Sequence, residues 1–128
     1  MLSHLRIRDF ALLDDVELTL GPGFTVLTGE TGAGKSLIVE AVALLRGARA
    51  TAEVIRADAD EASVEALFEL PPGGAVAAQL EAAGLPAGGE LIVRRVVARS
   101  GRGRCYVGGA LATAAQLGAV VGGLIDLA

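Results

Sequence analysis

The chain has 128 residues, of which 52% are hydrophobic and 20% charged, so it fits one folded domain and excludes both two domains and a disordered segment. The formal net charge of −4 argues against a generally basic nucleic-acid binder, and the single cysteine and single histidine disfavour zinc and Ser-His-Asp chemistry. The longest apolar stretch, residues 37–45, is too short to cross a bilayer, so we expect a cytoplasmic protein with no membrane partner.

The first half of the chain predicts strands followed by a helix. Alternation of apolar and polar side chains indicates half-buried strands, and a short apolar run between turns indicates a buried one. The helix is apolar around most of its circumference, as is typical of a helix packed against a sheet, and Gly47 is placed to end it. These patterns predict strands over residues 2–8, 16–20 and 24–28, a glycine-rich loop over 29–34 and a helix over 35–46.

The second half predicts short strands and helices after a surface connection. Thr113 is a candidate N-cap, and Cys105 is expected to be a small buried hydrophobe. The patterns predict a surface connection over 48–60, strands over 63–70, 91–98, 104–107 and 124–127, and helices over 75–83 and from Thr113 to about Val121. Four apolar residues at helical spacing are expected either in the core or on a face that docks a second lobe: Leu111, Leu117, Val120 and Val121. The abrupt end on an apolar run suggests a fragment of a longer protein.

One motif carries chemistry. Residues 29–36 fit the pattern G-x-x-x-x-G-K-[ST] of the phosphate-binding P-loop, or Walker A motif, and they lie between a predicted strand and a predicted helix. Glycines let successive backbone N–H groups point at phosphate oxygens, and the start of the helix adds its positive dipole end. The residues predicted to bind the nucleotide are Gly29, Glu30, Thr31, Gly32, Ala33, Gly34, Lys35 and Ser36.

Two side chains of the motif have distinct predicted roles. Lys35 would reach the β- and γ-phosphates of ATP and stabilise the charge that develops on the transferring phosphoryl group, so it is the predicted catalytic residue. The hydroxyl of Ser36 would ligate Mg²⁺, a hard cation that prefers oxygen. Hydrolysis also needs an acid that follows a second strand. Asp126 ends an apolar run. It is either this acid, which would help to bind the metal ion, or a residue at the end of a strand with no such role.

Arginines concentrate in the last third of the chain. Lys35 is the only lysine, and the other ten basic residues are arginines. The arginines on the predicted hairpin would either contact DNA phosphates independently of sequence or pair with acids, of which residues 61–90 hold five. Arg6 and Arg8 are expected on the polar face of the first strand, where they are either solvated or close to a nucleotide base. The candidate DNA contacts are Arg94, Arg95, Arg99, Arg102 and Arg104.

Nearly the whole chain resembles a known family. The opening Leu-Arg-Ile-Arg-Asp-Phe-Ala-Leu resembles the first strand of SMC-like and ABC-type ATPase heads, and the motif Gly-Glu-Thr-Gly-Ala-Gly-Lys-Ser is most similar to that of the RecN family of bacterial DNA-repair proteins. In related heads, the region of Arg6 and Arg8 passes close to the nucleotide base, and Arg56 resembles an arginine that some SMC-like heads place near DNA or nucleotide. Further segments that carry the resemblance are residues 16–28, 44–50, 54–57, 91–97 and 104–109.

The resemblance implies both a fold and a function. It implies an α/β P-loop NTPase fold in which residues 1–128 form the N-terminal lobe of an ABC/SMC-like head, with a mixed sheet and an antiparallel β-subdomain. It implies binding of ATP and Mg²⁺ in the repair of DNA double-strand breaks by recombination, near the nucleoid. The implied partners are the C-terminal lobe of the same head, a second head in an ATP-dependent dimer, and DNA. Hydrolysis would need both protein partners, so this chain alone is expected to bind ATP without hydrolysing it.

Two other functions are open at this point. A self-contained small P-loop NTPase or nucleotide kinase would need a lid and an acceptor site, for which the sequence shows no convincing set of residues. An ATP-gated DNA clamp would bind ATP with negligible turnover. Turnover by the chain alone would identify the first, and a lack of DNA-dependent hydrolysis in the completed head would identify the second.

Overall fold

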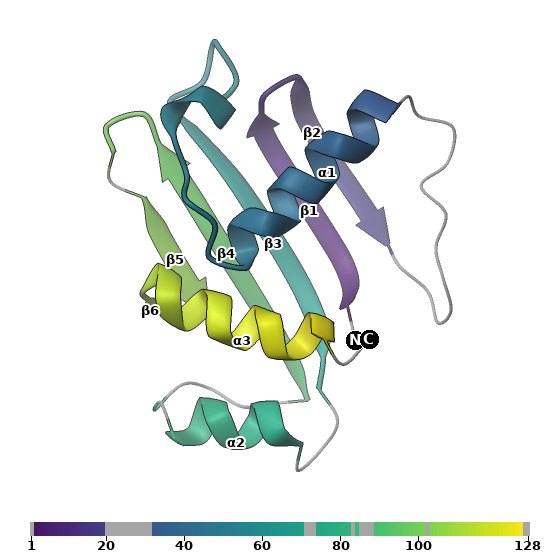
Figure 1. Cartoon of the computed structure of the whole chain (residues 1–128), viewed down its shortest axis with the longest axis vertical. Coiled ribbons are helices and arrows are strands. Elements are labelled where there is room, and N and C mark those ends of the chain that lie inside the picture. Colours follow the sequence, from purple (N-terminus) through teal and green to yellow (C-terminus); the bar gives the residue numbers. More distant parts are fainter. Residues whose placement is uncertain are drawn as a thin grey trace.

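The computed structural model describes residues 2–19, 32–70, 74–82, 84, 89–101 and 103–126, and of residues 32–36, 75–77 and 125–126 it describes the backbone only. Within these ranges, six strands form one antiparallel sheet in the order β2-β1-β3-β4-β5-β6. Two helices, α1 and α3, lie across one face of the sheet, and α2 lies beyond one end of the strands (Figure 1). The elements are β1 (Leu2–Phe10), β2 (Leu13–Thr19), α1 (Gly32–Leu45), the 3₁₀ turn η1 (Ala52–Val54), β3 (Glu61–Glu69), α2 (Ala75–Ala82), β4 (Glu90–Ala98), β5 (Arg104–Val107), β6 (Ala110–Ala112) and α3 (Ala114–Asp126).

The sheet has one buried face and one open face. In β1, the buried Leu5 and Ile7 alternate with polar side chains, and they pair in register with Ala66 and Val64 of β3, which are buried as well. Because successive side chains of a strand point to opposite sides, these residues share the face that lies under α1 and α3. One apolar core forms there, and it confirms the strands that the alternation predicted.

The α/β architecture and its antiparallel part agree with the expectation. The predicted P-loop strand over residues 24–28, which would make the sheet mixed, lies outside the described residues. None of the helices in the described ranges is long and apolar enough to span a membrane.

The helix α1 ends in a turn built around Gly47, as predicted. Gly47 has a φ of +93°, and its N–H donates to the carbonyl oxygen of Leu44 at 3.1 Å. The N–H of Ala48 donates to the carbonyl oxygen of Ala43, also at 3.1 Å. These two bonds form a Schellman motif, which satisfies carbonyl groups that the end of a helix leaves without partners.

The helix α3 starts as predicted and ends later than predicted. The N–H of Gln116 donates to Oγ1 of Thr113 at 3.0 Å, and the N–H of Thr113 donates to Oε1 of Gln116 at 2.9 Å, so the two residues form a capping box. The helix continues to Asp126, and the predicted strand over 124–127 is therefore wrong for its described part. Leu124 is buried on the same helix face as Leu117, a spacing that a four-residue apolar run does not reveal.

The hairpin predicted in the second half is confirmed as β4 and β5, and an unexpected strand follows it. Gly108 and Gly109 have φ values of +60° and +86° and turn the chain into β6, which pairs with β5. Two consecutive residues with positive φ are typical of a tight hairpin turn. Leu111 lies on β6 and is 71% exposed, so its helical placement and the core alternative are wrong for this residue, while Leu117, Val120 and Val121 are buried.

The connection between α1 and β3 is partly buried rather than a surface loop throughout. Ile55 is buried and forms an isolated bridge with Phe10 at the end of β1. The N–H of Arg56 donates to the carbonyl oxygen of Asp9 at 2.8 Å. The prediction of a surface connection is wrong at this point because the apolar residues beside Arg56 fill the end of the core.

Candidate nucleotide-binding site

The second half of the P-loop motif forms the start of α1. The backbone of residues 32–36 makes the first turn of the helix, which begins three residues before the predicted start at Lys35. The first turn of a helix presents N–H groups without intrahelical partners, and glycine at Gly32 and Gly34 leaves that backbone open to an approaching anion. This arrangement fits the phosphate groups of a nucleotide.

The predicted side-chain roles of the motif stay predictions. Gly29, Glu30 and Thr31 lie outside the described residues, and so do the side chains of Lys35 and Ser36. The side chain of Asp126 is outside as well, and the backbone places this residue in the last turn of α3 rather than at the end of a strand. The interpretation of Asp126 as an acid that follows a strand is therefore wrong.

The described chain determines where the motif helix lies. Ala41, Leu44 and Leu45 are buried, at a spacing that places them on one side of α1. The helix crosses the sheet diagonally, from its motif end near β1 and β2 to its C-terminal end beside α3 (Figure 1). Its 14 residues correspond to a length of about 21 Å. The C-terminal end is thus distant from the motif, and its contacts fix the direction of the helix.

The C-terminal end of α1 packs closely against α3. A Cβ atom added to Gly118 would lie 2.6 Å from the carbonyl oxygen of Arg46 and 3.2 Å from Cα of Gly47. Both atoms belong to the backbone and cannot rotate away. The close approach of the two helices therefore requires a residue without a side chain at position 118.

Arg95 contacts the same end of α1 from the sheet. Its Nη1 donates to the carbonyl oxygen of Leu44 at 2.7 Å and to that of Ala48 at 2.6 Å. These carbonyl groups lie at the negative end of the helix dipole, where a cation is stabilising. Arg95 lies on the inner side of β4 because the alternation that buries Leu91 and Val93 also turns position 95 inward.

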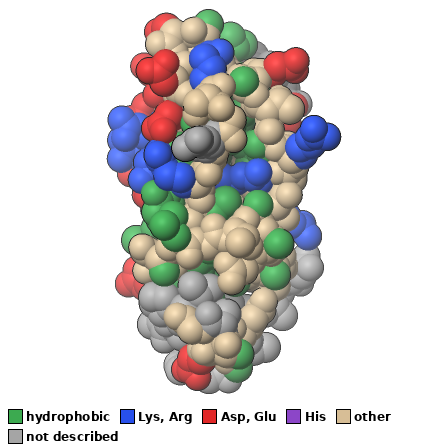
Figure 2. Space-filling view, turned by 90° about the vertical axis from the view of Figure 1, so that its left-hand side faces the viewer, with side chains coloured by type: hydrophobic (Ala, Val, Ile, Leu, Met, Phe, Trp, Pro, Cys, Tyr) green, Lys and Arg blue, Asp and Glu red, His purple; other side chains and the backbone are tan. Residues whose placement is uncertain are grey.

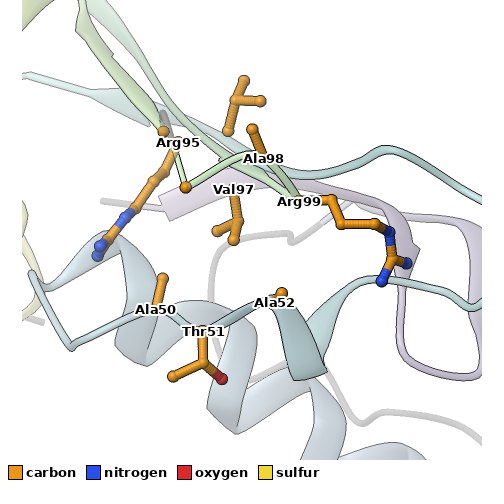
Figure 3. Close-up of a pocket in the computed structure, with 10 residues that line it drawn as sticks. Ala50, Thr51, Ala52, Arg95, Val97, Ala98 and Arg99 are labelled. Atoms are coloured by element: carbon orange, nitrogen blue, oxygen red, sulfur yellow. The ribbon is translucent and has the colours of Figure 1, made fainter.

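Arg99 has a comparable role at the end of the same strand. Arg95 of β4 and Arg99, which follows the strand, flank Val97, and their side chains extend to opposite sides of the segment Ala50–Ala52 (Figure 3). The guanidinium of Arg99 donates to the carbonyl oxygens of Ala59, at 3.0 and 3.2 Å, and of Arg56, at 3.1 Å. A cavity of about 170 Å³ lies between the two arginines. Both guanidinium groups therefore hold the connection between α1 and β3 against the sheet.

The five arginines predicted as DNA contacts do not share one surface. Arg94 is exposed on the open face of the sheet, opposite to Arg95. Arg104 pairs with Glu61 on that open face at 2.9 Å, and Arg102 lies outside the described residues. Strand alternation places Arg95 and Arg99 on the side of the sheet opposite to Arg94. The sequence alone could therefore have predicted this separation.

The open face brings Arg94 together with residues of β1 and β3. Cross-strand pairing places Glu65 between Arg6 and Arg94, and these three residues line one shallow groove with Arg8 and Ser63. In the part of the chain that the structure describes, the side chains of Arg8 and Arg94 make no hydrogen bond or ion pair, although the charge of Arg8 helps to lower the pKa of Asp15. These two arginines are therefore available to an anionic partner.

Arg6 is engaged in an ion pair with β2. Its Nε and Nη2 donate to the two carboxylate oxygens of Asp15, at 3.2 and 3.0 Å. This double hydrogen bond raises the pKa of Arg6 and lowers the pKa of Asp15. On the side of the molecule that Figure 2 shows, Lys and Arg side chains are interspersed with Asp and Glu side chains over the upper half. The charged surface there is mixed rather than uniformly basic.

Comparison with known sequences relates the chain to DNA-repair proteins. Residues 4–81 match the family described as an AAA domain. The DNA repair protein RecN of Halalkalibacterium halodurans and that of Bacillus subtilis are each 40% identical over 128 residues, and the matches cover 99% of this chain. The RecN protein of Streptomyces coelicolor is 43% identical over 106 residues, or 82% of this chain. These matches cover 23%, 22% and 18% of the three relatives, so the chain spans less than a quarter of their length.

Comparison with solved structures relates the fold to ATPase heads. An SMC ATPase chain from work on ATP-driven dimerisation has a TM-score of 0.73 at 23% identity, covering 97% of this chain and 79% of that one. The Smc head of Pyrococcus furiosus has a TM-score of 0.74 at 22% identity, covering 97% and 33%. The recombination mediator RecF has a TM-score of 0.71 at 18% identity, covering 91% and 29%. The predicted α/β head fold and the resemblance to RecN are thereby confirmed.

Proposed function

The chain belongs to the AAA domain family, and from this membership we propose that it binds ATP and Mg²⁺ as the N-terminal lobe of a RecN-like ATPase head. The observation that carries the proposal is the P-loop motif of residues 29–36, whose second half opens α1. Backbone N–H groups of the motif bind phosphate oxygens, Lys35 places its charge on the β- and γ-phosphates, and the Ser36 hydroxyl holds Mg²⁺. The head acts in the repair of DNA double-strand breaks by recombination, in the cytoplasm near the nucleoid.

The C-terminal lobe of the same head is the first partner in this proposal. The helix α1 is apolar around most of its circumference, yet the sheet covers only one side of it: Ala41 is fully buried, while Val39 is 67% exposed. A helix that is apolar on all sides is normally buried on all sides. The match covers 23% of the RecN protein of Halalkalibacterium halodurans, so the remainder of a protein of that length is large enough to supply a lobe that covers the exposed side. Hydrolysis then requires this lobe and a second head.

DNA is the second partner, and Arg94 is its main contact in this chain. The side chains of Arg94 and Arg8 are exposed on the open face without a hydrogen bond or ion pair among the described residues, and Arg104 is exposed to solvent beside Glu61. Arg102 stays a candidate on the sequence alone, because it lies outside the described residues. Contacts of this kind bind phosphates independently of sequence and weaken with salt. Arg95 and Arg99 are not among these contacts, because their guanidinium groups donate hydrogen bonds to backbone carbonyl oxygens.

The proposal is tested by ATP binding and hydrolysis. The chain is assayed alone and after co-expression with the C-terminal half of a RecN relative, each with and without linear DNA. We expect the chain alone to bind ATP without turnover, the mixture to hydrolyse ATP, and Lys35→Ala to abolish both activities. Arg49→Ala, which removes an exposed basic residue beyond α1, is the matched control and should leave both unchanged.

The other outcomes identify the alternatives. Equal turnover by the chain alone, dependent on Lys35, would refute a split head and support a self-contained NTPase. ATP binding with negligible turnover in the mixture, even with DNA, would support an ATP-gated clamp.

A further inference from the structure

Arg95 occupies an unusual position in β4. Along the inner side of this strand it follows Leu91 and Val93 and precedes Val97, which are 1%, 0% and 6% exposed. A guanidinium in such an apolar row loses hydration, and this loss is unfavourable unless polar groups of the protein replace the water. The replacements are the carbonyl oxygens of Leu44 and Ala48, at 2.7 and 2.6 Å. The charge at position 95 is therefore directed at one target, the C-terminal end of α1.

This contact completes a three-sided attachment of that helix end. The Schellman turn at Gly47 closes the helix, Gly118 of α3 lies against it, and Arg95 binds it from the sheet. Toward the opposite end, Leu37 and Ile38 are half-buried against the core, and the described side chains of the helix begin at Leu37. The three attachments therefore fix the direction of α1 at its C-terminal end.

The direction of α1 decides where the motif backbone lies. Because α1 is about 21 Å long, a tilt of about 3° at the attached end moves residues 32–36 by about 1 Å. A displacement of this size is large for hydrogen bonds to phosphate oxygens and for the placement of reacting groups.

We propose that Arg95 is a positioning residue for the nucleotide site, which acts by fixing the direction of the P-loop helix from its far end. This inference rests on the proposed binding of ATP. It assigns to Arg95 an effect on ATP affinity without any contact to the nucleotide. Arg99 has no such effect, because its carbonyl partners, Ala59 and Arg56, belong to the connection and not to the helix.

The test compares matched variants of the two arginines in the full chain. The affinity for a fluorescent ATP analogue with Mg²⁺ and the thermal unfolding midpoint are measured for Arg95→Met, Arg95→Lys and Arg99→Met. Methionine retains much of the aliphatic stem and removes the hydrogen bonds in both cases. We expect Arg95→Met to weaken ATP binding about tenfold, Arg95→Lys to recover part of the loss, and Arg99→Met to bind ATP as the unmodified chain does.

The outcomes separate this inference from the proposed function. Failure of the unmodified chain to bind ATP, or equal binding by Lys35→Ala, would overturn the proposed function. Normal binding that depends on Lys35 but is unchanged in Arg95→Met would overturn the positioning role alone. Equal losses of affinity in the Arg95 and Arg99 variants, in proportion to lost stability, would also overturn it. If Arg95→Met does not fold, Arg95→Lys decides: weaker binding at an unchanged unfolding midpoint supports the role, and unchanged affinity refutes it.

Discussion

Replacement of Gly118 by alanine should destabilise the chain, although alanine is the better helix former. The added Cβ would lie 2.6 Å from the carbonyl oxygen of Arg46, which is backbone, so α1 and α3 would have to move apart. Overpacking of this kind costs about 1–3 kcal/mol, and the gain in helix propensity returns about 0.5–1 kcal/mol. The difference is a net loss of up to about 2.5 kcal/mol, which at roughly 4 °C per kcal/mol for a chain of this length lowers the unfolding midpoint by up to about 10 °C.

Gly122 of the same helix is the matched control. A Cβ atom at this position meets nothing within 4 Å, so Gly122→Ala should raise stability by about 0.5–1 kcal/mol. Urea unfolding followed by circular dichroism measures both variants against the unmodified chain. Movement of the two midpoints in the same direction would contradict the close packing of α1 against α3.

Three further predictions concern other contacts. Thr113→Ala should lower the free energy of unfolding by about 1 kcal/mol through loss of the capping box, and Thr113→Ser should restore most of it in the same urea assay. Because Arg6 lowers the pKa of Asp15, the carboxyl should titrate below the usual aspartate pKa of 3.8, and Arg6→Gln should move the pKa upward in an NMR titration. A depressed pKa adds stability above the unfolded-state pKa, and this contribution disappears as the pH falls through the folded-state value; a titration unchanged in Arg6→Gln would contradict the pairing. Burial raises the pKa of the Cys105 thiol, so at pH 8 it should react with a thiol reagent slowly in the folded chain and rapidly in denaturant, and equal rates would argue against its burial.

The strands and caps could be predicted because their signals are local. Alternation of side chains identified β1, β3 and β4, and the Thr113 side chain marked the start of α3. Three-residue β6 and the end of α3 could not be predicted in the same way. A run as short as 124–127 is compatible with the period of a strand and with that of a helix. Leu124, the described side chain of the run, is buried on the same side of α3 as Leu117.

In the candidate site, too, features that are local in the sequence could be predicted and contacts between distant residues could not. Consecutive residues of the motif identified the P-loop, because its chemistry is local in sequence. The contacts of Arg95 could not be predicted, since its partners at positions 44 and 48 lie 51 and 47 residues away in the sequence. Alternation alone could have separated Arg94 from Arg95, whereas their closeness in the sequence suggested one basic patch.

The place of β1 inside the sheet also affects how the chain folds during synthesis. β1 is an inner strand whose second neighbour, β3, is made about 60 residues later, since Leu5 pairs with Ala66. At about 5–20 residues per second, the ribosome needs about 3–12 s to supply that partner, and until then one side of β1 has unpaired backbone groups. Contacts between residues so distant in sequence also slow folding. Until β3 is made, β1 and β2 form a hairpin without its other neighbour. The acidic residues Asp14, Asp15 and Glu17 on β2 give this hairpin negative charge, which disfavours pairing with other nascent chains.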